Sequence, residues 1–181
     1  MSTLKVSTIS PLGTDSTKTI TIGDLTNGDV AAGAFTNIPA FNVDKSSDQS
    51  ISDGTWTKVT FTNEHLDTDN AFSDSKFTVP TGKGGTYFFS SMIRGEATNG
   101  TAEYFSFAFY KNGSRQIIAN QVQTADNQLK NSHIFGSSTF TLSAGDYIEV
   151  YANFGGTSPV VAGDSSRDIS SFFTGHRLIG A

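Results

Sequence analysis

Apolar and polar residues alternate with a period of two along most of the chain, in segments too short for long helices. From residue 39 onward the segments of strand character lie at 39–43, 56–61, 76–79, 86–94, 103–110, 116–123, 133–142, 146–154 and 170–179. Turn residues separate them, among them the pair Asn112-Gly113, which is typical of a two-residue hairpin. Neither a long amphipathic helix nor an internal repeat is visible. The pattern predicts an all-β domain.

Several of these segments carry large side chains on both faces. Phe105, Phe107 and Phe109 alternate within 103–110 and are expected to face the core. A monomeric sandwich would leave its outer faces mostly polar, so a second apolar face predicts contact with a neighbouring subunit. Tyrosine suits such an interface because it joins a large apolar area to a polar tip. The interface candidates are Tyr104, Tyr110, Tyr147, Tyr151 and His176.

Residues 1–38 differ from the rest of the chain. Leu4, Val6 and Ile9 are isolated apolar points in a Ser/Thr-rich setting, and Ile20 and Ile22 alternate with threonine in a second short segment. The segment has too few apolar residues to form a hydrophobic core of its own, so it needs another surface to pack against. We expect an N-terminal docking arm of two short strands at 1–38, before a single domain at 39–181; an unstructured tail is the alternative.

Composition excludes several classes of protein. The chain has 181 residues, a net charge of -5 and no cysteine. An acidic chain lacks the basic stripe of a general nucleic-acid binder, no apolar run approaches the length of a membrane span, and disulfide scaffolds are excluded. The first residues lack the basic and apolar regions of a secretion signal, which counts against a secreted protein.

Candidate catalytic chemistry is sparse. His65, His133 and His176 share no metal-ligand spacing, and no G-x-S-x-G nucleophile motif occurs, so we expect neither an enzyme nor a cofactor. Asp67 and Asp69 begin like a calcium loop, but the pattern then fails because apolar residues stand where a ligand and a glycine belong. A surface turn is the preferred interpretation of that segment.

Four motifs resemble the jelly rolls of the C1q/TNF type. The residues at 85–90, Gly-Thr-Tyr-Phe-Phe-Ser, are similar to the strand "glycine, any, tyrosine, any, phenylalanine" of that family. The hairpin at 110–113, the strand entry at 142–150 and the closing strand at 171–178 follow in the right order and spacing. His176 departs from the aromatic or aliphatic residue common in the closing strand. The resemblance implies a jelly-roll sandwich, a homotrimer and no enzymatic activity, and it leaves calcium binding open because some C1q-like trimers bind calcium.

The arm resembles the start of fibre and other virion proteins of marine tailed bacteriophages, in which a short N-terminal segment precedes a C1q-like head. That resemblance implies a protein assembled in the host cytoplasm and exposed on the virion, whose partners are its own copies, other tail or capsid proteins and a host surface glycan or protein. A short tail fibre or spike for host attachment is the first hypothesis. A capsid decoration protein that clamps the shell through its arm is the second, and a secreted C1q-like recognition protein is a remote third.

A fibre would contact its receptor through loops at the free end of the trimer. The polar loops long enough for this are 64–74, 123–131 and 155–167. Their receptor candidates are Asp126, Asn127, Gln128, Asp164 and Arg167.

Overall fold

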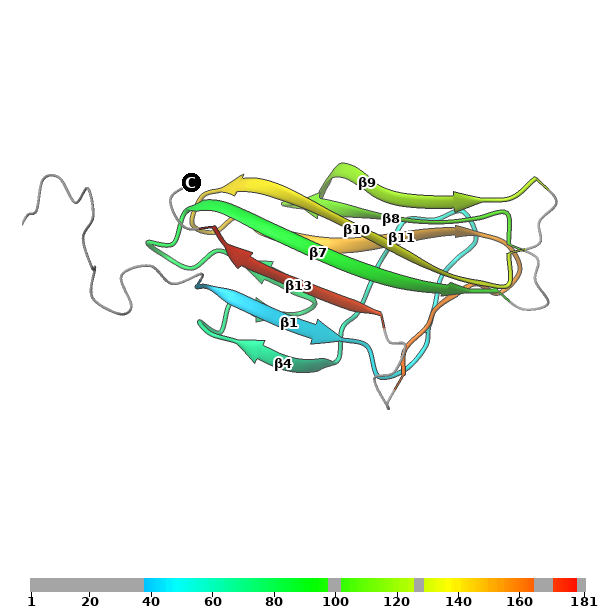
Figure 1. Cartoon of the computed structure of the whole chain (residues 1–181), viewed down its shortest axis with the longest axis horizontal. Coiled ribbons are helices and arrows are strands. Elements are labelled where there is room, and N and C mark those ends of the chain that lie inside the picture. The colour runs from blue at the N-terminus through cyan, green and yellow to red at the C-terminus, as the bar shows by residue number, and fades with distance from the viewer. Residues whose placement is uncertain (1–37, 98–101, 126–128, 165–170, 179–181) are drawn as a thin grey trace, which may run out of the picture. The chain divides into compact units, whose positions relative to one another are not determined.

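The computed structural model describes residues 38–97, 102–125, 129–164 and 171–178, all of them in strands, turns or loops (Figure 1). The arm candidates Leu4, Val6, Ile9, Ile20 and Ile22 lie outside these residues, so the arm and its boundary stay predictions. Within the described part, no helix is long and apolar enough to cross a membrane.

The described residues form two antiparallel sheets. In sheet A, β7 is the central strand: it pairs with β10 along one edge and with β13 and β12 along the other. The strands of sheet A are β1 (Ala40–Asp44), β2 (Gln49–Ser50), β4 (Asn63–Asp67), β7 (Gly85–Glu96), β10 (Asn131–Leu142), β12 (Val160–Val161) and β13 (Phe172–Arg177).

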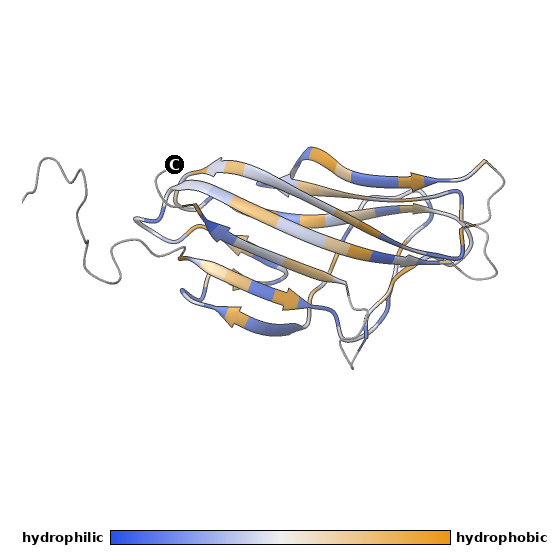
Figure 2. Cartoon of the chain, in the orientation of Figure 1, coloured by the Kyte–Doolittle hydropathy of each residue, from blue (hydrophilic) through white to orange (hydrophobic). Residues whose placement is uncertain are grey.

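Sheet B lies against sheet A and is built around β11, which pairs with β8 on one edge and with β6 and β3 on the other. Its strands are β3 (Thr57–Lys58), β5 (Phe72–Ser73), β6 (Lys76–Thr78), β8 (Tyr104–Lys111), β9 (Ser114–Gln123) and β11 (Tyr147–Gly155). Apolar and hydrophilic residues alternate along the strands of both sheets (Figure 2). This arrangement is the all-β jelly roll that the sequence predicted.

Aromatic side chains fill the space between the sheets. Phe105, Phe107 and Phe109 are fully buried, as their alternation predicted. Phe173 of β13 packs edge-on against Phe41 at 4.8 Å between ring centroids, and its ring also lies 6.1 Å from that of Phe109 in sheet B. Edge-to-face pairs of this kind stabilise a core beyond the area they bury. The aromatic layer therefore joins the two sheets.

The turn chemistry at one hairpin follows from the sequence. β8 and β9 are joined by Asn112 and Gly113, whose φ angles are 51° and 75°. Positive φ at both central residues is the geometry of a type I′ turn, whose twist matches that of the flanking strands.

The segment 64–74 was expected to be a polar loop, and that prediction is wrong for part of it. Residues 63–67 form β4, and residues 72–73 form β5. β4 is an edge strand that pairs only with β1, and its middle three residues are exposed. An exposed edge strand needs no apolar alternation, which is why the sequence pattern did not reveal it.

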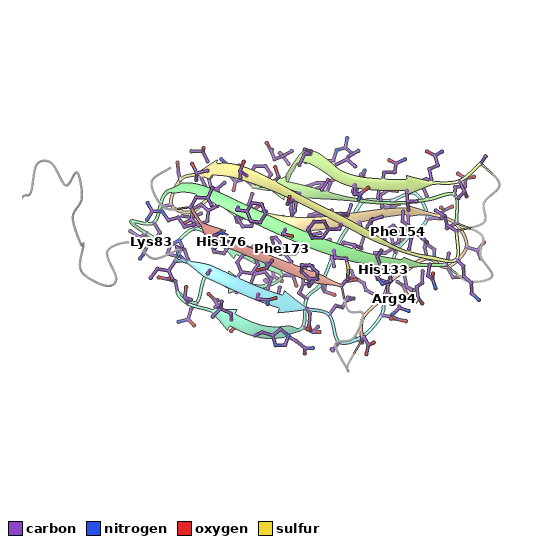
Figure 3. All side chains as sticks on the ribbon, viewed as in Figure 1. Lys83, Arg94, His133, Phe154, Phe173 and His176 are labelled. Atoms are coloured by element: carbon purple, nitrogen blue, oxygen red, sulfur yellow. The ribbon has the colours of Figure 1, made fainter. Side chains whose placement is uncertain are left out.

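The sandwich has two distinct ends, separated by the length of β7, roughly 35 Å for its 12 residues. At one end, the backbone amide of Arg177 donates to Pro39 and that of Thr68 donates to Ala40, each at 3.1 Å. Lys83 and His176 lie toward this end, whereas Arg94 and His133 lie toward the other (Figure 3). The chain therefore enters the jelly roll at one end, and β7 finishes at the opposite end.

The aromatic layer gives a stability prediction. Phe173→Ala should lower the free energy of unfolding by about 3–5 kcal/mol, because it removes a fully buried ring and leaves a cavity. Urea unfolding followed by circular dichroism measures this. Ile117→Ala, at a side chain that is 43% exposed, is the control and should change it by about 0.5 kcal/mol at most. Equal losses from both variants would contradict this description of the core.

Candidate functional site

The outer face of sheet A carries exposed apolar side chains. Strand register places Phe172, Met92 and Phe135 side by side across β13, β7 and β10. Phe135 is 54% exposed, and its ring centroid lies 6.5 Å from that of Phe172. On the same face, Phe88 lies 5.6 Å from the ring of His176. Phe172, Met92 and Phe135 therefore form an apolar band across this face, without a covering layer among the described residues. A polar row of Ser90, Ser137 and Thr174 separates the band from Phe88 and His176, and Arg94 and His133 border its other side.

The outer face of sheet B carries a second cluster, made of aromatic and charged residues. The rings of Tyr110 and Tyr151 stack at 4.0 Å with an interplanar angle of 23°. Trp56 lies 6.2 Å from Tyr110, and the Arg115 guanidinium sits 5.1 Å from the centroid of the Trp56 ring. Tyr147 belongs to the same face because it alternates with the buried residues of β11.

The five interface candidates do not lie on one surface. Tyr104, Tyr110, Tyr147 and Tyr151 are on the outer face of sheet B, whereas His176 is on the outer face of sheet A. The hydroxyl of Tyr104 donates to the side chain of Asn153 at 2.8 Å. The tyrosines could be grouped from the sequence, because they alternate with core residues. The presence of Trp56 and Arg115 beside them could not be predicted, because Trp56 precedes its strand and β9 is exposed on both faces.

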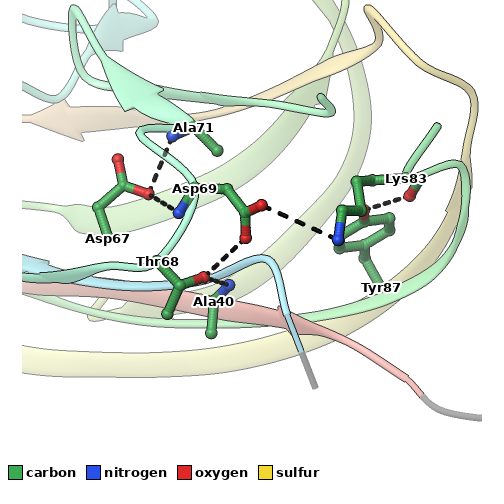
Figure 4. Close-up of polar contacts among 7 residues, drawn as sticks. All are labelled: Ala40, Asp67, Thr68, Asp69, Ala71, Lys83 and Tyr87. Carbon is green, nitrogen blue, oxygen red and sulfur yellow. Dashed lines mark hydrogen bonds and ion pairs between the residues drawn. The ribbon is translucent and has the colours of Figure 1, made fainter. Parts of the chain in front are cut away.

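The three predicted loops divide between the two ends of the sandwich. Residues from 123–131 and 155–167 meet at a cavity of about 370 Å³. Its lining residues are Asp48, Glu96, Ala97, Lys130, Asn131, Ser158 and Val160. The turn of segment 64–74 lies instead at the entry end, where the Asp69 carboxylate is 4.0 Å from the Lys83 ammonium (Figure 4).

Most of the receptor candidates cannot be placed. Asp126, Asn127, Gln128 and Arg167 lie outside the described residues. Asp164 is half-buried, and its backbone amide donates to the carbonyl of Lys45 at 2.9 Å.

The calcium-like segment is a capped turn. The Asp67 carboxylate accepts a hydrogen bond from the backbone amide of Ala71 at 2.9 Å, and the Thr68 hydroxyl donates to Asp69 at 2.9 Å (Figure 4). The same carboxylate also accepts from the backbone amide of Phe72 at 2.8 Å. The carboxylate oxygens that a cation would need are therefore already engaged in hydrogen bonds within the turn. Among the described residues, no group of three His, Cys, Asp or Glu side chains could hold a metal ion.

The histidines occupy separate positions in sheet A. His65 Nε2 lies 2.7 Å from an oxygen of Asp44, whose other oxygen accepts from the Asn63 amide at 2.8 Å. His133 is exposed on β10, and His176 lies beside Phe88. Next to Asp44 along the chain is Lys45, a buried cation. Its ammonium donates to the backbone carbonyl and to the hydroxyl of Thr60, each at 2.9 Å. Burial lowers the pKa of Lys45, and the nearby Asp48 partly opposes that shift.

Electrostatics also shape the outer face of sheet B. The Lys58 ammonium lies 2.9 Å from the Glu149 carboxylate. Burial works to lower the pKa of Lys58, but its hydrogen bond and charge interaction with Glu149 raise it overall. Burial and the charge of Glu149 raise the pKa of Tyr151. The Tyr151 phenol is therefore a neutral hydrogen-bonding group at physiological pH.

Comparison with known proteins bears on the fold. No family profile matches the sequence, and no curated protein matches it. The globular domain of a zebrafish complement 1qA protein is similar in structure, with a TM-score of 0.53, 15% identity, and coverage of 77% of this chain and 97% of that chain. Murine APRIL matches with a TM-score of 0.53, 13% identity, and coverage of 77% and 98%. Eiger TNF from S. frugiperda matches with a TM-score of 0.56, 14% identity, and coverage of 78% and 93%. The chain is therefore a jelly roll of the C1q/TNF type.

One carboxylate gives a pH prediction. The hydrogen bond from Asn112, followed by those from the Ser143 backbone and Lys111, lowers the pKa of Asp146 from 3.8 to about 2. A lowered folded-state pKa contributes stability that is present above pH 3.8 and is lost as the pH falls toward 2. Asp146→Asn should therefore be less stable than the native chain at pH 6, and this difference should shrink between pH 4 and 2. Urea midpoints across that range measure it, and a gap that stays constant would contradict the assignment.

Proposed function

We propose that the chain is a non-enzymatic, homotrimeric surface protein of a tailed-phage virion, acting as a short tail fibre or spike in host attachment. The observation that carries the trimer is the exposed apolar band on the outer face of sheet A. A side chain such as Phe135, 54% exposed beside Phe172 and Met92, is costly to leave in water and marks a contact surface. Packing this band against a neighbouring subunit gives the homotrimer that the C1q/TNF resemblance implies.

Of the five residues predicted to line the subunit interface, only His176 lies on the face that this proposal assigns to it. His176 lies on the same face as the apolar band, next to Phe88. The four tyrosines lie on the other sheet, so they remain available for another partner.

The two ends of the domain support a role in attachment. The chain enters the jelly roll beside Pro39 and Ala40, so the predicted arm joins it at that end. The loops 123–131 and 155–167 meet at the opposite end, around the cavity next to Glu96. A trimer with this polarity would carry three copies of each loop, so weak individual contacts would add through avidity.

The same polarity fits a decoration protein anchored by its arm, which is the second candidate. The two differ in where the chain lies on the particle. If the proposal is correct, antibody labelling or a particle reconstruction should place the chain at the tail, and purified trimer should bind host cells. Density on the capsid shell, with particles lacking the chain becoming fragile to heat, would favour decoration instead. Absence from the particle would contradict both and favour a secreted recognition protein.

The trimer face gives a mutational prediction. Phe135→Asp should convert the trimer into monomer, because it places a charge in an apolar interface core. Ile118→Asp is the matched control: its side chain is 44% exposed on sheet B, and the variant should remain trimeric. Sedimentation at micromolar concentration distinguishes a trimer, of three times 19.2 kDa, from a monomer of 19.2 kDa. Dissociation by Ile118→Asp but not by Phe135→Asp would place the interface on sheet B.

A further inference from the structure

The aromatic cluster on the outer face of sheet B has the composition of a binding surface. Trp56, Tyr110 and Tyr151 pack in sequence, with ring centroids 6.2 Å and 4.0 Å apart, and all three are only half-buried. Fixed aromatic rings offer a large contact area at low conformational cost. The cluster is therefore a rigid, partly exposed aromatic platform on the sheet.

The platform also offers polar groups to a ligand. Tyr104 uses its hydroxyl internally, in the hydrogen bond to Asn153. No described residue hydrogen-bonds to the hydroxyls of Tyr110, Tyr147 or Tyr151, and none of these oxygens is buried. Three phenol groups on one face are thus free to donate to or accept from a bound molecule.

Two cations flank the platform. The Arg115 guanidinium lies 5.1 Å from the Trp56 ring centroid, and the Lys76 ammonium lies 5.1 Å from that of Tyr147. Neither forms an ion pair with a described residue, whereas Lys58 on the same face pairs with Glu149. The protein as a whole carries a net charge of -5. The nearby carboxylates of Glu149 and Asp74 both lie beside Lys58, so the positive charge of Arg115 and Lys76 is left for an anionic ligand at this face.

Partly exposed aromatic rings, free phenols and unpaired cations together match one ligand chemistry. A sugar ring presents an apolar C–H face that packs on aromatic rings, while its hydroxyls form hydrogen bonds at the rim. A uronate adds a carboxylate, whose geometry suits the two-pronged hydrogen bonding of a guanidinium. We propose that the outer face of sheet B binds an acidic glycan, with sugars packed against the partly exposed cluster of Trp56, Tyr110 and Tyr151 and carboxylates on Arg115 and Lys76. This inference rests on the proposed role in attachment and adds a glycan-contacting surface to the loops at the end of the domain.

The arrangement also limits the entropy cost of binding. The contact with the Trp56 ring restricts the long Arg115 side chain before a ligand arrives, so less rotamer freedom is lost on binding. Lysine would replace this arginine poorly, since an ammonium lacks the planar fork of paired donors.

Intrinsic fluorescence tests the site directly, because Trp56 is the only tryptophan in the chain. Titrating the purified full-length trimer with α-1,4-linked galacturonate hexamer should change the Trp56 emission saturably, and raising the salt concentration should weaken the binding. Maltohexaose, a neutral glycan of the same length, should bind at least about tenfold more weakly. Arg115→Gln should weaken galacturonate binding by about tenfold or more, and Arg115→Lys should restore only part of it.

Lys83→Gln, which removes a cation at the entry end of the domain, away from the receptor loops, is the charge-matched control and should leave binding unchanged. Tyr151→Ala should weaken binding while sedimentation still shows a trimer. Equal binding of both hexamers, no saturable change at millimolar galacturonate, or equal effects of Arg115→Gln and Lys83→Gln would overturn the inference. Dissociation of the trimer by Tyr151→Ala would overturn it as well and assign the face to a subunit contact. A trimer that binds host cells but not galacturonate would contradict the glycan site alone and leave the attachment role standing.

Discussion

The packing of Phe173 between the two sheets is the interaction on which the rest of the structure depends. This ring comes from β13, inside sheet A, and lies 5.8 Å from Phe61 and 5.9 Å from Phe89. Together with the rings of Phe41 and Phe109 it fills the inner faces of both sheets. Because these inner faces are occupied by core side chains, function is left to the outer faces and the loops.

The two outer faces differ in chemistry, and this difference underlies the proposed division of roles. Sheet A presents Phe135, Phe172 and Met92, which lack polar tips and gain most from complete burial against another subunit. Sheet B presents tyrosine hydroxyls and cations stacked on rings, which keep hydrogen-bonding groups in contact with water. An apolar band favours a permanent contact between subunits, whereas an aromatic surface with polar groups at its tips favours reversible binding of a ligand.

Alternation and turn chemistry were sufficient to predict an all-β domain, the buried phenylalanines of β8 and the Asn112-Gly113 hairpin, whereas the jelly roll was expected from the resemblance of four motifs to the C1q/TNF type. β4 was not predicted, because an edge strand exposed to solvent lacks the apolar period that marks a strand in sequence. The tyrosines could be assigned to a common face, but which residues lie on the outer face of sheet A and which on that of sheet B could not be derived. That division depends on which strands pair, since pairing brings Phe135 beside Met92 from positions far apart in the chain. The Trp56–Arg115 contact has the same origin.

The central claim is that sheet A's outer face is buried between subunits while that of sheet B remains open. Hydroxyl-radical footprinting of the assembled protein, read out residue by residue by mass spectrometry, tests it most directly. Met92, Phe135 and Phe172 should be protected from oxidation, whereas Trp56 and Tyr110 should react readily. Protection of Trp56 and Tyr110 together with oxidation of Phe135 would contradict the account and place the subunit contact on sheet B.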